Sequence, residues 1–253
     1  LKNGRPQSND HGGSVYMDGY HVSNYGYKGH GPLFQNVVFQ SNQARFTTSD
    51  YHRYGGAVYA YRSTPYFRDV TFKYNTAPRH GGAFYVHQAD TNKTITFERT
   101  TFTSNYTDLG ESETSQQGGA VYSSYTGKMV FKNCVFDSNT VNMNGNSDNY
   151  AGAIYANDLY DSLVVRNTKF RYNKVYTPSG NNGSSARAGA MYVRGQAHFL
   201  VTNSIFIGNE AVSSVYTHDN GNTYTHNSYG GALMIDLNNF SNSGGYTYPY
   251  KSI

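Results

Sequence analysis

Two short motifs alternate along the whole chain, and their alternation limits the possible folds more than any other feature of the sequence. The first motif reads Gly-Gly-Ala, then an apolar residue, then Tyr. Two copies have Ala in place of the first Gly, and the first and last copies match more loosely. The motif occurs at 12–16, 55–59, 81–85, 118–122, 151–155, 188–192 and 230–234. The second motif ends in F-x-x-N and occurs at 34–42, 67–75, 97–105, 131–139, 165–173 and 201–209. Such a recurring unit predicts a repeat fold, in which each unit buries its apolar face against its neighbours.

Side chains in the first motif alternate with a period of two, which predicts a strand with one buried face. The fourth and sixth positions are mostly apolar and vary in size, as in Val58/Ala60 and Phe84/Val86, so we expect them to face the core. The Ala and Tyr of the third and fifth positions then face outward, with the opposite phase as the alternative. In the favoured phase the tyrosines stack as an outward ladder of Tyr59, Tyr85, Tyr122, Tyr155 and Tyr192.

The second motif predicts two short strands around a turn, each with an inward-facing pair of side chains. The turn residue is Asn36, Asp69, Arg99, Asn133, Asn167 or Asn203, and the motif closes on Asn42, Asn75, Asn105, Asn139, Asn173 or Asn209. Asn suits both corners because it tolerates left-handed backbone angles and bonds to nearby backbone, and stacked Asn side chains can exchange amide hydrogen bonds. The inward phenylalanines of the second strand are expected to form a stacked core column of Phe39, Phe72, Phe102, Phe136, Phe170 and Phe206.

Three short strands per repeat, separated by Gly- and Asn-bearing corners, predict an all-β fold over residues 1–253. We expect one domain, a right-handed single-stranded parallel β-helix (solenoid) of about seven rungs, which is either a whole solenoid or a segment of a longer one. The chain's 27 Gly and 26 Tyr fit turns and strands better than helices. A β-sandwich or propeller is less favoured, since both need systematic hairpin signals.

Repeat length varies at one corner. Between the closing Asn and the next Gly pair, 5 residues separate Asn75 from Gly81, whereas 20 separate Asn209 from Gly230. We expect polar loops at this corner, which in solenoids is often the binding face. The predicted loops are 106–117, 140–150, 174–187 and 210–229.

Charge, hydropathy and cysteine content exclude several function classes. The net charge of +4 comes without a basic cluster, so no nucleic-acid partner is predicted. No stretch of about 18 apolar residues occurs, so we expect no membrane-spanning helix. Cys134 is the single cysteine and occupies an inward position, which predicts a small buried side chain rather than a nucleophile.

Acidic and histidine residues form no recognisable catalytic or metal-binding pattern, so we predict no catalytic residues, no metal site and no cofactor. Paired carboxylates are needed for acid/base chemistry on sugars, but no acidic position recurs in adjacent repeats. The better explanation is polar loop residues for Asp158 with Asp161, for Glu111 with Glu113, and for His218 and His226 near Asp219. His11 and His80 precede Gly pairs, but no Asp-Asp or Arg-x-Lys companion of a hydrolase site accompanies them.

The alternation of GGA-[ILV] with F-x-x-N resembles the repeat of the polymorphic membrane protein family, first associated with chlamydial outer-membrane adhesins. The resembling region runs from Gly12 to about Asn242. The resemblance implies a secreted, surface-displayed β-helix used for adhesion or for building extracellular structure.

The expected function is therefore structural and non-enzymatic: part of a cell-surface appendage or filament, or an adhesin stalk. No cap pattern occurs at either end, which predicts either continuation of a longer solenoid or head-to-tail self-association. The alternative is a glycan-binding module that uses the exposed Tyr ladder, the loop edge and Tyr246, Tyr248 and Tyr250. A polysaccharide lyase or hydrolase is the third and weakest hypothesis.

Four N-x-[ST] sequons are candidate glycosylation sites in a secreted protein: Asn92, Asn105, Asn182 and Asn239. Asn182 is the best candidate because it lies in a predicted loop. Asn105 is a weaker one, since a corner Asn is expected to use its amide in hydrogen bonds.

Overall fold

The computed structural model describes most of the chain, and within the described residues every regular element is a β-strand. The described residues are 1–5, 12–19, 21–22, 26–27, 31–44, 54–109, 115–143, 147–177, 185–195, 198–213, 215–217, 223–225 and 227–236. No helix long and apolar enough to cross a membrane is found among them.

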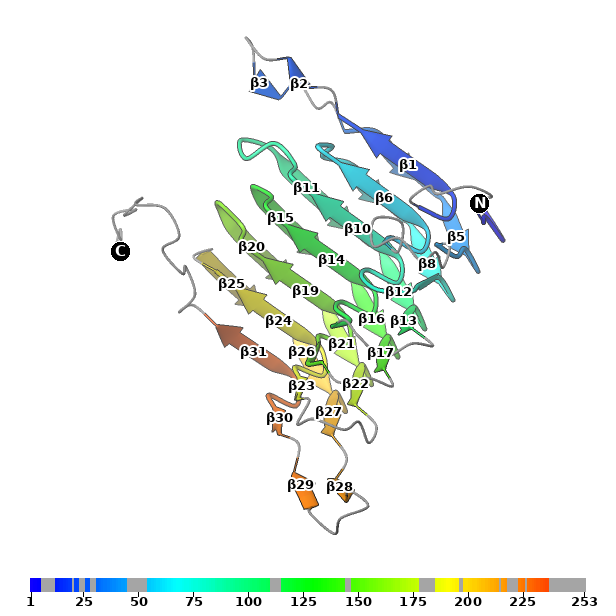
Figure 1. Ribbon diagram of the computed structural model, residues 1–253. Helices are drawn as coiled ribbons and strands as arrows, with labels where there is room; N and C mark the ends of the chain where they lie inside the picture. The colour runs from blue at the N-terminus through cyan, green and yellow to red at the C-terminus, as the bar shows by residue number, and fades with distance from the viewer. Residues whose placement is uncertain are drawn as a thin grey trace.

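Successive copies of the first motif form a parallel sheet of seven strands, which follow one below another from β1 at the top to β31 at the bottom of Figure 1. This first sheet contains, in order, β1 (Val15–Asp18), β6 (Val58–Tyr61), β10 (Phe84–His87), β14 (Val121–Ser124), β19 (Ile154–Asn157), β24 (Met191–Arg194) and β31 (Leu233–Asp236). The register aligns equivalent motif positions, so that Tyr85 pairs with both Tyr59 and Tyr122.

The two halves of the second motif form the second and third sheets, each of six parallel strands. The second sheet contains β4 (Leu33–Gln35), β7 (Tyr66–Arg68), β11 (Thr94–Glu98), β15 (Lys128–Lys132), β20 (Ser162–Arg166) and β25 (His198–Thr202). The third contains β5 (Val38–Gln40), β8 (Thr71–Lys73), β12 (Thr101–Thr103), β16 (Val135–Asp137), β21 (Lys169–Arg171) and β26 (Ile205–Ile207). The chain is thus an all-β parallel solenoid, as the repeats predicted.

A fourth parallel sheet begins directly after the closing Asn, where polar loops were expected. It contains β9 (Thr76–Ala77), β13 (Tyr106–Leu109), β17 (Thr140–Met143), β22 (Lys174–Thr177) and β27 (Glu210–Ser213). In the described residues, five of the six second motifs are therefore followed by a fourth strand, where three strands per repeat were expected. Sheet pairing uses backbone groups, so the polar side chains of these segments do not prevent it.

Shorter strands complete the described part of the chain. A small parallel sheet precedes the later Gly pairs and contains β18 (Asn149–Tyr150), β23 (Ala186–Arg187) and β30 (Ser228–Tyr229). Two antiparallel hairpins are formed by β2 (His21–Val22) with β3 (Gly26–Tyr27), and by β28 (Val215–Thr217) with β29 (Thr223–Thr225).

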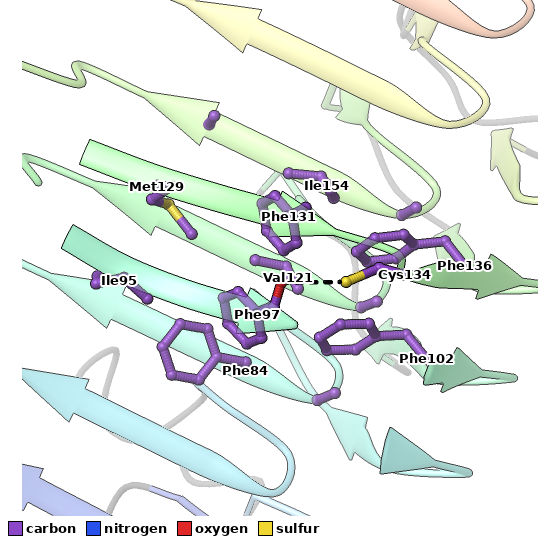
Figure 2. Close-up of a cluster of buried hydrophobic side chains, with 14 of the residues drawn as sticks. Phe84, Ile95, Phe97, Phe102, Val121, Met129, Phe131, Cys134, Phe136 and Ile154 are labelled. Atoms are coloured by element: carbon purple, nitrogen blue, oxygen red, sulfur yellow. Dashed lines mark hydrogen bonds between the residues drawn. The ribbon is translucent and has the colours of Figure 1, made fainter. Parts of the chain in front are cut away.

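Two columns of stacked phenylalanines fill the core. In the predicted column from Phe39 to Phe206, neighbouring ring centroids lie 4.6–4.9 Å apart. A second column, from Phe34 to Phe131, comes from the second sheet with spacings of 4.8–5.0 Å. The columns meet edge to face, and Figure 2 shows Phe97 and Phe131 beside Phe102 and Phe136. Such aromatic pairs add about 0.5–1.5 kcal/mol each beyond their area burial.

The corners are made by residues with left-handed backbone angles. All six turn residues of the second motif have positive φ, between 47° for Arg99 and 56° for Asn36. At the closing corner the prediction is wrong by one residue, because the positive φ belongs to the residue before the Asn: Ser41, Tyr74, Ser104, Ser138, Tyr172 or Gly208. This placement leaves the closing Asn with ordinary angles and an inward-pointing side chain.

The alanines of the first motif lie in the core, although the sequence placed them on the outer face. Ala57, Ala83, Ala120, Ala153 and Ala190 are completely buried and belong to the main core cluster. The reason is that the Gly pair bends the chain and the strand begins only at the fourth position, as at Phe84 of β10. The strict alternation therefore applies from the fourth position onward, where Val58 and Ala60 face the core as expected.

Candidate functional site

The tyrosines of the first motif form a continuous stack, but this stack is buried. Ring centroids of consecutive tyrosines from Tyr59 to Tyr192 lie 4.9–5.3 Å apart, in nearly parallel planes. Their exposed fractions are 2–8 %. The predicted stack is therefore confirmed, and it lies apart from the main core cluster, but its expected exposure is wrong.

A second layer of side chains covers the tyrosine stack. It consists of the residues immediately before the Gly pairs: Tyr54, His80, Gln117, Tyr150, Arg187 and Tyr229. The backbones of these residues pair in parallel from one coil to the next. The Tyr54 ring lies 4.7 Å from that of Tyr85, and the His80 ring 4.7 Å from that of Tyr122. A large side chain before most Gly pairs was visible in the sequence, and it was the signal for this covering layer.

Burial in this two-layer wall shifts the ionisation of its groups. Desolvation raises the pKa of Tyr155 to about 12 and raises the pKa of Tyr85 as well. Desolvation, aided by the charge of Arg79, holds the pKa of His80 well below its usual range. The wall is therefore uncharged at neutral pH at these positions, which suits a structural layer.

The closing asparagines form a hydrogen-bonded ladder along the solenoid. From Asn42 to Asn173, each Nδ2 donates to the Oδ1 of the next Asn at 2.8–3.0 Å. Each backbone N–H from Asn42 to Asn173 donates to the same Oδ1, at 3.0–3.1 Å. The Nδ2 of Asn75, Asn105, Asn139, Asn173 and Asn209 also donates to a phenylalanine carbonyl of the preceding coil.

One of the four predicted glycosylation sites, Asn105, belongs to this ladder. Asn105 is completely buried and its amide makes ladder bonds, which disfavours it as an acceptor. Asn92 lies exposed in a turn, where its backbone N–H donates to Asp90 Oδ1 at 2.9 Å. Asn182 and Asn239 lie outside the described residues, as do Tyr246, Tyr248 and Tyr250.

Cys134 lies in the core beside the phenylalanine columns. Its Sγ donates to the carbonyl of Phe97 at 3.4 Å, drawn as a dashed line in Figure 2. Burial raises the pKa of the thiol to about 12, so a thiolate does not form at neutral pH. The side chain fills a small core position, occupied in the next repeat by Thr168.

Among the described residues, no group of three or more His, Cys, Asp and Glu side chains is arranged to hold a metal ion. His80 is buried in the covering layer. Asp158 and Asp161 lie in the connection between β19 and β20, where partial burial raises the pKa of Asp158. The remaining candidates, Glu111, Glu113, His11, His218, Asp219 and His226, fall outside the described residues.

Two adjoining hollows open at the corner where the first sheet passes into the second. One measures about 510 Å³ and is lined by Thr91, Asn92, Lys93, Thr94, Lys128, Tyr160 and Asp161. The other measures about 370 Å³ and is lined by Gln88, Ala89, Thr91, Tyr125 and Tyr160. This corner follows the first-motif strands, whereas the insertions identified in the sequence precede them.

Comparison with known proteins agrees with the repeat architecture. Residues 69–87 match the family model of the Chlamydia polymorphic membrane protein repeat, a stretch that contains β8, β9 and β10. No curated protein and no solved structure matches the chain with statistical significance. The chain is thus a parallel β-solenoid protein whose repeats resemble the Chlamydia polymorphic membrane protein repeat.

Proposed function

We propose that this chain is a non-enzymatic structural module of a secreted or cell-surface appendage, filament or adhesin stalk. In this proposal the solenoid is a right-handed coil of about seven rungs that extends by end-to-end association. The repeat resemblance supports a place at the cell surface. The scarcity of carboxylates in the sequence, 16 Asp and Glu in 253 residues, supports a non-enzymatic role.

The observation that carries the proposal is the location of the exposed aliphatic side chains. In the described residues, the Leu, Ile and Val side chains that are exposed all belong to the first or the last coil: Leu1, Leu33, Val38, Leu200, Ile205, Ile207 and Ile235. On β26, Ile205 and Ile207 are 48 % and 47 % exposed, whereas β21 carries Lys169 and Arg171 at the paired positions. Exposed apolar side chains gathered at the two ends of the stack support association through those ends.

The asparagine ladder has two unlike ends. At the N-terminal end, Asn42 Oδ1 already accepts from the backbone N–H of Gly4 and from the Ser14 hydroxyl. At the other end, the backbone N–H of Asn209 has no acceptor among the described residues. The two ends of the ladder therefore differ among the described residues, in line with the proposed head-to-tail association, in which unlike ends meet.

The test compares the wild type with an Ile205→Lys/Ile207→Arg variant, which copies the charged pair of the preceding strand. We expect concentration-dependent rods longer than one chain for the wild type in sedimentation velocity and negative-stain images, and single rods for the variant. A Tyr172→Lys control changes an exposed side chain of an inner coil and should assemble as the wild type does. A wild type that remains a single rod at high concentration would contradict the proposal.

Glycosylation stays part of the proposal only for sequons other than Asn105. Asn92 is the acceptor that the described residues support, because it is exposed at a turn. Intact-mass measurement of the native protein before and after deglycosylation, compared with an Asn92→Gln variant, tests this. An unchanged mass for the native protein rules the modification out.

A further inference from the structure

The corner hollows are lined by the connections of successive coils, which backbone hydrogen bonds join to one another. Figure 1 shows these connections, from β10 to β11, β14 to β15 and β19 to β20, at the same edge of the solenoid. The backbone N–H of Tyr160 donates to the Thr126 carbonyl at 2.8 Å, and that of Lys128 to the Lys93 carbonyl at 3.4 Å. These bonds join the connections of neighbouring coils, so residues on them lie side by side.

Two tyrosines present accessible rings to the hollows. Tyr160 is 57 % exposed and Tyr125 is 41 % exposed, and their ring centroids lie 6.5 Å apart with a tilt of 36°. The corner itself does not require an aromatic residue at position 125, since the equivalent left-handed positions are Gln88 and Asp158. The rings thus offer apolar faces that the core does not use.

Polar and charged side chains surround these rings. Lys93 and Lys128 supply two ammonium groups against the single carboxylate of Asp161, so the lining is positive. Lys128 forms no ion pair with any described residue. Thr91, Thr94 and Asn92 add groups that can both donate and accept hydrogen bonds.

We propose that this corner binds an acidic saccharide. Pyranose rings present flat C–H faces that pack on aromatic rings, and the hydroxyl groups at their edges can donate to Asp161 or bond to Thr91 and Asn92. The carboxylate or sulfate of such a sugar would pair with Lys128 and Lys93 through charge-assisted hydrogen bonds. The tyrosines that bind glycan are then Tyr125 and Tyr160 rather than the buried stack. This proposal is independent of end-to-end association.

Calorimetric titration with two acidic probes tests the site and distinguishes a carboxylated saccharide from a sulfated one as its ligand. The probes are a galacturonic acid tetramer, which carries carboxylates, and a heparin-derived tetrasaccharide, which also carries sulfates. The protein is produced in a host without N-glycosylation, because Asn92 lines the hollow. We expect binding of at least one probe, weakened at least tenfold by Tyr160→Ala and by Lys128→Gln. For the tetragalacturonate, methyl esterification should weaken binding to the same extent.

Matched controls separate this site from general surface effects. Tyr172→Ala removes a tyrosine with 59 % exposure from another corner, and Lys169→Gln removes an exposed lysine of β21. Both should bind as the wild type does, and circular dichroism should show the same fold for all variants. Three results would overturn the proposal: no binding of either probe at millimolar concentration, binding unaffected by Tyr160→Ala, or an equal loss in Lys169→Gln, which would indicate nonspecific charge attraction.

Discussion

At the residue scale, asparagine has two distinct roles in this solenoid. The turn residues, such as Asn133 with φ of 55°, lie exposed and supply a left-handed backbone angle. The closing residues, such as Asn139, are completely buried and use the side-chain amide to connect coils. Both sit at corners of the same motif, yet only the second role depends on a carboxamide.

Substitution distinguishes the two roles. Asn139→Ala leaves the backbone N–H and Nδ2 of Asn105 without their acceptor and removes a donor from the Phe102 carbonyl. Each unpaired buried group costs about 1–3 kcal/mol, so we expect the free energy of unfolding to fall by at least about 3 kcal/mol. Asn133→Gly, which keeps the left-handed turn, should change it by less than about 0.5 kcal/mol. Guanidinium denaturation measures both, and similar losses in the two variants would contradict the ladder's role.

His80 gives the buried wall a pH dependence. Its lowered pKa means that the unfolded chain binds a proton near pH 6.5 while the folded chain does not, so stability falls as the pH drops below about 6.5. The loss is at most about 1.4 kcal/mol for each pH unit below that value. His80→Gln copies Gln117, the paired residue of the next coil, and should reduce this dependence.

The measurement is the free energy of unfolding at pH 7.5 and pH 5 for both proteins. Half-buried His87, whose pKa is also lowered, is present in both and cancels in the comparison. An identical pH dependence in wild type and variant would show that His80 is not neutral in the fold.

At the element scale, the Gly pair that precedes each first-sheet strand contains two positions with different constraints. The first has positive φ, and Ala takes this position with φ of 58° at Ala151 and 61° at Ala188. The second is Gly in all seven copies of the motif. A Cβ at Gly119 would lie 2.2 Å from the Gly152 carbonyl oxygen and 2.7 Å from the Thr140 backbone, because β17 crosses close to the pair.

Alanine substitution at the two glycines should therefore differ in cost. Gly118→Ala places a residue where other repeats already carry Ala, and we expect a loss of about 1–2 kcal/mol from the left-handed conformation. Gly119→Ala should cost at least about 3 kcal/mol, because backbone on two neighbouring coils would have to move. Thermal and guanidinium unfolding of both variants test this order, and equal costs would contradict the close approach.

At the scale of the whole molecule, stability is distributed along a stack in which each coil contacts only its neighbours. Inner coils are covered on both sides, so Phe102 packs between Phe72 at 4.9 Å and Phe136 at 4.6 Å. The last phenylalanine of the column, Phe206, stacks on Phe170 and is only partly buried.

Truncation of these two phenylalanines should lower the free energy of unfolding by different amounts, more at the inner coil than at the last coil. We expect Phe102→Ala to cost about 3–5 kcal/mol, as for a fully buried aromatic side chain. Phe206→Ala should cost less than half as much, because the position is partly solvated and its removal leaves no enclosed cavity. Denaturant unfolding monitored by circular dichroism checks the ratio. Equal losses would contradict this difference and mean that Phe206 is as fully covered in solution as Phe102.

The sequence by itself determined the parallel solenoid, the inward positions of the strands and the phenylalanine column, because a period of two and a repeated motif encode burial locally. Only the tertiary structure decided that Tyr59 and its equivalents are buried, that a fourth sheet follows the closing Asn, and that Tyr125 and Tyr160 share a hollow with Lys128. The physical reason is that the burial of a side chain and the pairing of a strand depend on side chains and backbone about 30 residues away, in the next coil. A strand pattern shows which face a residue takes, but not what lies against that face.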